Sequence, residues 1–213
     1  MNKKSHVSPN QARHLSDCEL MQVMREKAAK RNAPVERSKK WHLALPRARD
    51  VELLLLDVDG VLTDGTIFYD QTGGEIKGFN TQDGFGLNLL RRGGVDVGLI
   101  TAKISPALVR RCHHLNITRV YQGAKNKLRV FDKILLETRL RPPQVAYMGD
   151  DWLDLQLLAR VGLSAAPPNA VPEVLKRVHY ITDRRGGQGA VREVCDLILE
   201  ARGVLASLFQ DYA

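Results

Sequence analysis

The sequence predicts an α/β fold in which a doubly wound, mostly parallel sheet carries helices on both faces. Short apolar runs alternate along the chain with segments of helical spacing, at intervals typical of βαβ units. The four leucines at 53–56 show no polar alternation, which indicates a strand covered on both faces. Several such runs end at polar residues, and sheets of this class bind ligands at the carboxyl ends of their strands. A chain of 213 residues, 44% of them hydrophobic, can bury this core.

Residues 1–35 form a polar, basic extension ahead of a domain at 36–213. We expect the extension to be poorly ordered, with a short helix after Ser16 and Glu19, which have capping-box spacing. One alternative is a binding arm, and another is a translation start at Met21 or Met24.

The elements of the domain follow in order. Trp41, Leu43 and Leu45 alternate ahead of the first strand, so we expect this segment to cover one side of the sheet. A turn at 70–74 joins hairpin strands at 66–69 and 75–79. Gly93 and Gly94 end the next helix. Further helices are predicted at 83–92, 105–115, 128–138, 153–161, 171–178 and 191–201, and further strands at 95–100, 120–121, 144–148, 163–165 and 180–181.

Composition and charge narrow the class of protein. Residues 1–50 hold 12 of the 32 Lys and Arg residues but 5 of the 24 Asp and Glu residues, so most of the net charge of +8 lies there. The near-neutral remainder argues against a nucleic-acid-binding protein. Three scattered cysteines give no disulfide framework and no zinc spacing. No apolar stretch reaches the roughly 18 residues of a membrane span, and the N-terminus lacks the apolar core of a secretory signal. We therefore expect a cytoplasmic protein.

Polar residues at four strand ends should converge on one rim of the sheet. Each of them alone could be a turn residue, a helix cap or a surface lysine. Together they indicate phosphoryl transfer, because an aspartate can attack phosphorus and form an aspartyl-phosphate. A Mg²⁺ held by carboxylates, with a lysine and a hydroxyl donor, would offset the repulsion between that aspartate and a dianionic ester. The residues are Asp57, Asp59, Thr101, Lys127, Asp150, Asp151 and Asp154.

The motif DVDGVLTDG, which begins at Asp57, resembles the nucleophile motif of the haloacid-dehalogenase superfamily of phosphohydrolases. The resemblance implies that Asp57 is the nucleophile and a Mg²⁺ ligand. It implies that Asp59 protonates the leaving alkoxide, activates water and gives the metal its backbone carbonyl.

The same resemblance implies roles for the residues at the remaining strand ends. Thr101 would bind the phosphoryl group, Lys127 would bridge it to the nucleophile, and Asp150 would be the second side-chain metal ligand. Lys127 fits the family's Gln-Gly-x-x-x-Lys pattern better than Lys125 does. The second shell of the metal, which orients its ligands and waters, would contain Asp151 and Asp154.

The substrate class is narrowed by what the chain lacks and by further motifs. The segments 59–101 and 101–127 are too short to hold a cap domain, so we expect a capless phosphatase with an open site and a protruding β-hairpin. The motifs FNTQDGFG, YQGAKNK, GDDWLDL and GGQGAVREVCDLIL resemble the 3-deoxy-D-manno-octulosonate 8-phosphate phosphatase family of lipopolysaccharide biosynthesis. That family implies a homotetramer built by the hairpin, and a C-terminal tail that can close a neighbour's site. The glycine-rich loop 186–189 either flexes near the site or simply precedes a helix.

One departure concerns substrate recognition. The family has Thr-Gly-Arg after the second strand, whereas this chain has Thr101-Ala102-Lys103. Lysine lacks arginine's bidentate fork, so binding of a sugar carboxylate by Lys103 would differ. Arg111 matches a family arginine and would compensate. A nine-carbon, sialic-acid-type sugar 9-phosphate is the alternative substrate.

Two other functions are compatible with parts of the sequence. A catalytically idle scaffold could bind an acidic partner through its basic extension. Deletion of residues 1–35 distinguishes a phosphatase from such a scaffold. A catalytic domain retains its phosphatase activity without the extension, whereas the scaffold loses its binding. A phosphomutase is disfavoured because phosphoryl transfer between sugars usually needs a cap that excludes water.

Overall fold

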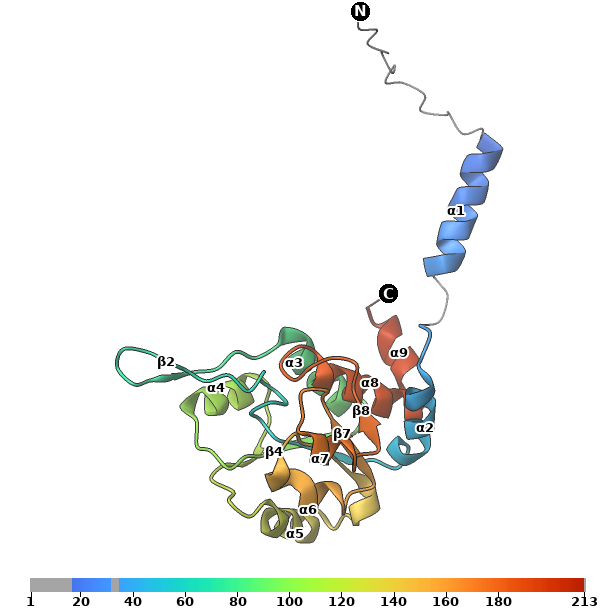
Figure 1. Cartoon of the computed structure of the whole chain (residues 1–213). Coiled ribbons are helices and arrows are strands. Elements are labelled where there is room, and N and C mark those ends of the chain that lie inside the picture. The colour runs from blue at the N-terminus through green and yellow to red at the C-terminus, as the bar shows by residue number, and fades with distance from the viewer. Residues whose placement is uncertain (1–16, 32–34, 213) are drawn as a thin grey trace, which may run out of the picture. The chain divides into compact units, whose positions relative to one another are not determined.

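The structure is a computed structural model that describes residues 17–31 and 35–212 (Figure 1). The chain divides into two units, Met1–Arg37 and Ser38–Ala213. In the first unit, α1 (Asp17–Arg31) is the short helix expected in the extension. Ser16, its predicted cap, lies outside the described residues, as do residues 1–15 and 32–34, so the prediction of a poorly ordered extension stays a prediction.

Six parallel strands form the sheet of the second unit. They are β1 (Leu53–Leu56), β4 (Asp96–Ile100), β5 (Arg119–Tyr121), β6 (Val145–Met148), β7 (Leu163–Ala166) and β8 (Tyr180–Ile181). Their order is β5-β4-β1-β6-β7-β8, so the four-leucine strand lies at the centre. Leu53 of β1 stands opposite Asp96 on one side and Val145 on the other. The predicted doubly wound, parallel sheet is confirmed.

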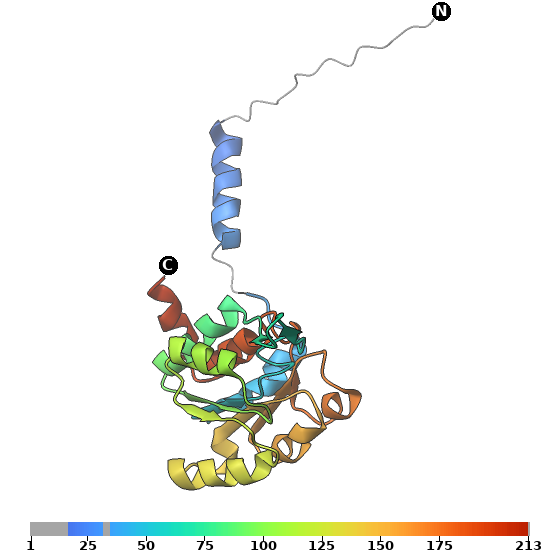
Figure 2. The same cartoon turned by 90° about the vertical axis from the view of Figure 1, so that its left-hand side faces the viewer.

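Each face of the sheet has its own hydrophobic core. Leu54 and Leu56 face one cluster and Leu53 and Leu55 the other, and all four are 0% exposed. Burying one such side chain contributes about 1.5–3 kcal/mol. Figures 1 and 2 show the helices on opposite sides of the sheet. The first cluster takes α2 (Lys39–Ala48), α3 (Thr81–Arg92), α4 (Pro106–His114) and α8 (Ala190–Ala201); the second takes α5 (Lys127–Thr138), α6 (Leu155–Leu158) and α7 (Pro172–Leu175).

The segment before the first strand differs from the expected alternation. It is the helix α2, which begins after Ser38, whose side chain accepts a hydrogen bond from the Trp41 N–H. Helical spacing buries Trp41, Ala44 and Ala48 and leaves Leu43 70% exposed. The prediction that Leu43 covers the sheet is therefore wrong, because two of the three inward residues are alanines that the apolar pattern did not distinguish.

Two other helices are shorter than predicted, and one helix was not predicted. The helix expected at 153–161 is a 3₁₀ turn, Trp152–Asp154, followed by the single turn of α6. The chain leaves α6 early because Gly162 passes so close to the Pro143 carbonyl that a Cβ there would lie 2.1 Å from its oxygen. The helix expected at 171–178 ends at Leu175, and the His179 N–H already joins β7 by bonding Ser164. The short C-terminal helix α9 (Leu205–Gln210) was not predicted.

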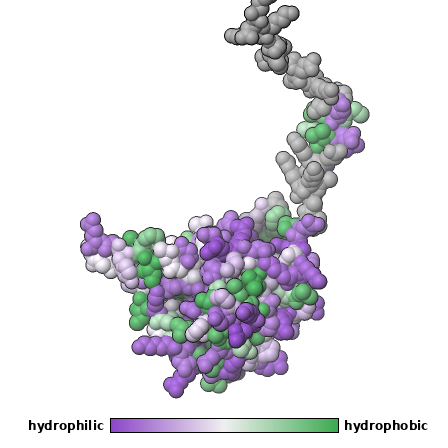
Figure 3. All heavy atoms as spheres, in the orientation of Figure 1, coloured by the Kyte–Doolittle hydropathy of each residue, from purple (hydrophilic) through white to green (hydrophobic). Residues whose placement is uncertain are grey.

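The hairpin consists of β2 (Phe68–Tyr69) and β3 (Glu75–Ile76), both shorter than expected. It protrudes from the body, and Figure 3 shows apolar surface along it; Phe68 is 59% and Ile76 54% exposed. Between Asp59 and Thr101, all of which the structure describes, the hairpin, α3 and β4 are the elements present. No cap domain interrupts this stretch, and α4 and β5 are the elements between Thr101 and Lys127, so the capless architecture is confirmed. Among the described residues, no helix has the length and apolarity to cross a membrane.

Candidate active site

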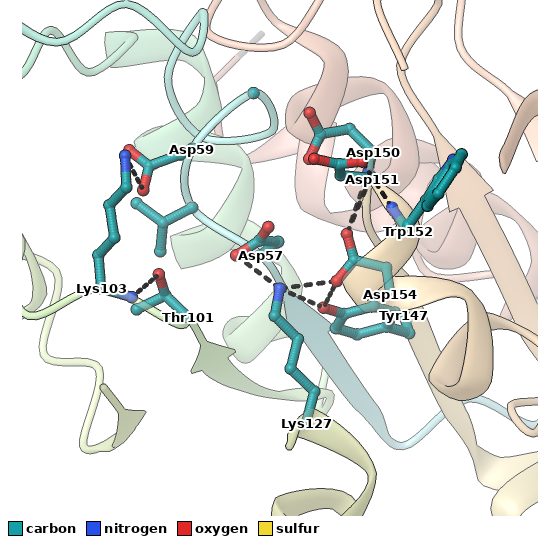
Figure 4. A network of polar contacts seen from close by, with 12 residues as sticks. Asp57, Asp59, Thr101, Lys103, Lys127, Tyr147, Asp150, Asp151, Trp152 and Asp154 are labelled. Atoms are coloured by element: carbon teal, nitrogen blue, oxygen red, sulfur yellow. Dashed lines mark hydrogen bonds and ion pairs between the residues drawn. The ribbon is translucent and has the colours of Figure 1, made fainter. Parts of the chain in front are cut away.

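Four loops at the carboxyl ends of adjacent strands bring the predicted residues together (Figure 4). Asp57 follows β1, and its backbone N–H donates to the Met148 carbonyl of β6 at 2.9 Å. Thr101 follows β4. Lys127 begins α5, after the loop that leaves β5, and its helix is capped by Asn126. Because parallel strands end at the same edge of a sheet, residues far apart in sequence meet here.

Lys127 is the centre of the cluster. Its Nζ lies 2.9 Å from Asp57 Oδ1 and 2.6 Å from Asp154 Oδ1, and the side chain is 2% exposed. The Tyr147 hydroxyl donates to the same Asp154 oxygen at 2.6 Å. Burial alone would lower the pKa of Lys127, but the two carboxylates outweigh it and raise the pKa. The ammonium is therefore held charged between two acids.

Asp154 is fully buried, and both oxygens of its carboxylate accept hydrogen bonds. Oδ1 accepts from Lys127 and Tyr147, and Oδ2 accepts the backbone N–H groups of Asp150 and Asp151 at 3.0 and 3.2 Å. This explains the 3₁₀ turn, since Asp151 and Asp154 form a capping box across it. Asp154 thus fixes both the lysine and the loop that carries Asp150.

Asp150 differs, because its Oδ1 is buried without a hydrogen-bond partner. A buried acceptor in that state needs an explanation, such as an ion. Oxygens of Asp57, Asp150 and Asp154 lie within 4.8 Å of one another. Gly60, in the left-handed region at φ +87°, leaves the space beside Asp150; a Cβ there would lie 2.0 Å from Asp150 Oδ2.

The cluster raises the pKa of two carboxyl groups. Burial, followed by the charge of Asp154, raises the pKa of Asp57 to about 6, although Lys127 opposes the change. Burial, followed by the charges of Asp57 and Asp154, raises the pKa of Asp150 to about 7. One ammonium does not neutralise three close carboxylates, so the site attracts a further cation.

Asp59 and Thr101 lie beside this cluster rather than in it. Lys103 Nζ is 3.9 Å from Asp59 Oδ2, and the Lys103 N–H donates to Thr101 Oγ1 at 3.3 Å (Figure 4). A residue that the sequence analysis missed, Lys77, reaches Asp59 Oδ1 at 2.5 Å from the end of the hairpin. Its only sequence signal is a charged residue in a predicted strand, which is common on exposed strands.

Arg111 and the glycine-rich loop are placed elsewhere. The Arg111 guanidinium donates to the Asn80 carbonyl at 3.0 Å and does not join the carboxylates. The Gly187 N–H donates to the Val61 carbonyl at 3.0 Å, and a Cβ on Gly186 would lie 1.8 Å from the Gly60 oxygen. The loop therefore packs against the backbone that follows the β1 aspartates, directly ahead of α8.

Comparison with known proteins agrees with this geometry. Residues 107–194 match the family model of haloacid dehalogenase-like hydrolases. Over 161 residues the chain is 45% identical to the 3-deoxy-D-manno-octulosonate 8-phosphate phosphatase of Yersinia pestis, which covers 76% of this chain and 86% of the relative. The chain belongs to this phosphatase family. It is accordingly a phosphoric monoester hydrolase, and the resemblance inferred from the motifs is confirmed.

Solved structures of the phosphatase family share the fold. The crystal structure of the Yersinia pestis 3-deoxy-D-manno-octulosonate 8-phosphate phosphatase matches with a TM-score of 0.75 and 44% identity, over 76% of this chain and 88% of that one. The enzyme from Moraxella catarrhalis, solved with a magnesium ion, a phosphate ion and a KDO molecule, matches with a TM-score of 0.78 and 35% identity, over 80% and 98%.

Proposed function

We propose that this protein hydrolyses a sugar-acid phosphate monoester, specifically 3-deoxy-D-manno-octulosonate 8-phosphate, through an aspartyl-phosphate on Asp57. The observation that carries the proposal is the buried Lys127, which holds Asp57 and Asp154 beside the unpartnered oxygen of Asp150. The names of the relatives, and the ligands of the Moraxella catarrhalis structure, support the substrate.

The residues fit a Mg²⁺ ion. Mg²⁺ prefers carboxylate oxygens and water, and Asp57 and Asp150 offer oxygens in a site with excess negative charge. Asp154 already receives donors on both oxygens, so we assign it and Asp151 to supporting the ligands. The backbone carbonyl of Asp59 would complete the protein's share. When bound, the ion would neutralise charge on the phosphoryl oxygens.

The hydrolysis then proceeds in two displacements. A carboxylate oxygen of Asp57 attacks phosphorus, the bond from phosphorus to the sugar oxygen breaks, and Asp59 gives that oxygen its proton. Asp59 next takes a proton from water, whose oxygen attacks phosphorus and breaks the bond to Asp57. Lys127 and the Thr101 hydroxyl would stabilise negative charge on the phosphoryl group.

Recognition of the sugar acid falls to residues on the open side of the site. Lys103 is half exposed and reaches toward Asp59, so it can meet a substrate carboxylate from solvent. Arg111 is held by Asn80 within this chain, and its role in binding stays a prediction. A nine-carbon sugar 9-phosphate remains the alternative substrate, since the chain carries lysine in place of the family's arginine.

The proposal includes the setting of the enzyme. We infer a cytoplasmic homotetramer in which the exposed apolar residues of the hairpin, Phe68 and Ile76, are covered by neighbouring copies. The phosphatase domain would begin near residue 36, with the basic extension outside it. The deletion of residues 1–35 should therefore leave kcat within about twofold of the full chain.

A panel of phosphate esters tests the function. Release of phosphate is measured from eight- and nine-carbon sugar-acid phosphates, hexose phosphates and nucleotides, with and without Mg²⁺. We expect a preference for the eight-carbon ester that is lost when the metal is chelated. Preference for the nine-carbon ester would show that this ester is the substrate. Absence of phosphate release from every ester in the panel would contradict the proposal.

Asp150→Asn is expected to separate metal binding from stability. Because the pKa of Asp150 is raised to about 7, its carboxyl binds a proton more firmly in the folded than in the unfolded chain. The metal-free wild type therefore loses stability as the pH rises from 3.8, the ordinary pKa of an aspartate, to about 7, and the variant escapes this loss. At pH 8 without metal, the variant should unfold about 2–4 °C higher, the shift that ~1 kcal/mol gives.

Thermal unfolding with and without Mg²⁺, from pH 5 to 8, measures both effects. The advantage of Asp150→Asn should shrink steadily as the pH falls from 7 to 5, toward the ordinary aspartate pKa of 3.8, and Mg²⁺ should stabilise the wild type but not the variant. Equal stabilisation of both proteins by Mg²⁺ would show that Asp150 is not a ligand.

A further inference from the structure

Lys77 occupies an unusual position for a lysine. It follows β3, on the return strand of the hairpin, yet its side chain is 1% exposed. Lysine is almost never fully buried unless it is paired. Its Nζ lies 2.5 Å from Asp59 Oδ1 and 3.5 Å from Glu75 Oε1. The hairpin thus places a buried positive charge, the Lys77 ammonium, against the Asp59 carboxylate.

The lysine is itself anchored. The Ser105 hydroxyl, at the N-cap of α4, donates to Glu75 Oε1 at 2.6 Å. Ser105 is 1% exposed, and its backbone N–H donates to Gln122 Oε1 at 2.7 Å. A continuous chain of contacts therefore runs from the body of the domain through the hairpin to Asp59, although the hairpin itself protrudes into solvent.

We propose that Lys77 is a positioning residue for Asp59: it holds Oδ1 and leaves Oδ2, on the side of Lys103, to exchange the proton with the sugar oxygen and with water. This inference rests on the proposed function of Asp59 as the acid and base. A carboxylate on a loop would otherwise sample several rotamers, and general acid catalysis requires hydrogen-bond reach to the reacting oxygen. The hairpin thus fixes the orientation of the Asp59 carboxyl group, which is the proton donor.

The leaving group tests the inference. A sugar alkoxide needs a proton from Asp59, whereas p-nitrophenolate leaves without one. We measure kcat/KM, which reports the steps through the first displacement, for the sugar 8-phosphate and for p-nitrophenyl phosphate. Lys77→Met should lower the value for the sugar ester by about 10–10²-fold, part of the 10²–10⁴-fold that general acid catalysis supplies. For the aryl ester it should fall less than about threefold.

Three further variants sharpen the test. Asp59→Asn should show the same leaving-group dependence more strongly, and adding Lys77→Met to it should cost the sugar ester little more, because coupled residues are not additive. Glu75→Gln weakens the contact to Lys77 without removing the side chain. It should lower kcat/KM with the same leaving-group dependence as Lys77→Met, but by smaller factors. Lys133→Met, which removes an exposed lysine from α5, should change neither.

The outcomes distinguish this inference from the proposed function. If Asp59→Asn shows the leaving-group dependence but Lys77→Met and Glu75→Gln lower both esters equally, Lys77 is merely structural and the inference is overturned. Losses that multiply in the double variant would overturn it too. If Asp59→Asn itself affects both esters equally, the assigned role of Asp59 fails, and the inference fails with it.

Discussion

Asp57→Asn is expected to reduce kcat by roughly 10⁴–10⁶-fold, as removal of a nucleophile does in enzymes with covalent intermediates. The amide that replaces the carboxylate is a poor nucleophile toward phosphorus and cannot form an acyl-phosphate. The measurement is phosphate release from the sugar 8-phosphate at saturating Mg²⁺. Trapping of a phosphorylated protein after rapid acid quench should succeed with the wild type and fail with the variant.

The control for this variant is Asp132→Asn, which makes the same chemical change at an exposed ion pair on α5. That variant should keep full activity. Asp57→Asn should also keep its fold, because it removes one of the charges that raise the pKa of Asp150. A variant that unfolds at or above the wild-type temperature and still turns over at the wild-type rate would rule out Asp57 as the nucleophile.

The sequence predicted the sheet because its strands carry the strongest signal in the chain. Leu53–Leu56 is a short run that is apolar on both faces, as a strand in the middle of a parallel sheet must be, and all four residues are buried there. Short elements were less well predicted. In α2 the inward face contains Ala44 and Ala48, whose small side chains look the same to a hydropathy pattern whether they are buried or exposed. The short length of α6 depends on the close approach of Gly162 to Pro143, which is a tertiary contact.

The sequence points to some residues of the candidate site but not to others. Asp57, Lys127 and Asp150 could be found because each follows a strand in a motif of fixed spacing, and parallel strands end on one rim. Lys77 could not, because its burial depends on how the hairpin returns across Asp59. Nor does the sequence show that Arg111 is engaged by the Asn80 carbonyl, since that contact joins two different helices' ends.

Lys127→Met is expected to damage both activity and stability, because it leaves Asp57 and Asp154 buried without their cation. Breaking a buried pair by removing one partner costs about 3–5 kcal/mol, which corresponds to a fall in unfolding temperature of roughly 6–20 °C at ~2–4 °C per kcal/mol. The loss of charge at the phosphoryl site should lower kcat by about 10²–10³-fold, as removal of a single electrostatic contact does elsewhere.

A second substitution separates these two effects. Asp154→Asn added to Lys127→Met removes the uncompensated charge, so the double variant should recover part of the unfolding temperature but none of the activity. Lys125→Met is the matched control, since Lys125 lies in the same loop and is exposed; it should match the wild type in both measurements. If the double variant regained activity together with stability, Lys127 would act only by holding the fold, and the charge that stabilises the phosphoryl group would have to come from another residue.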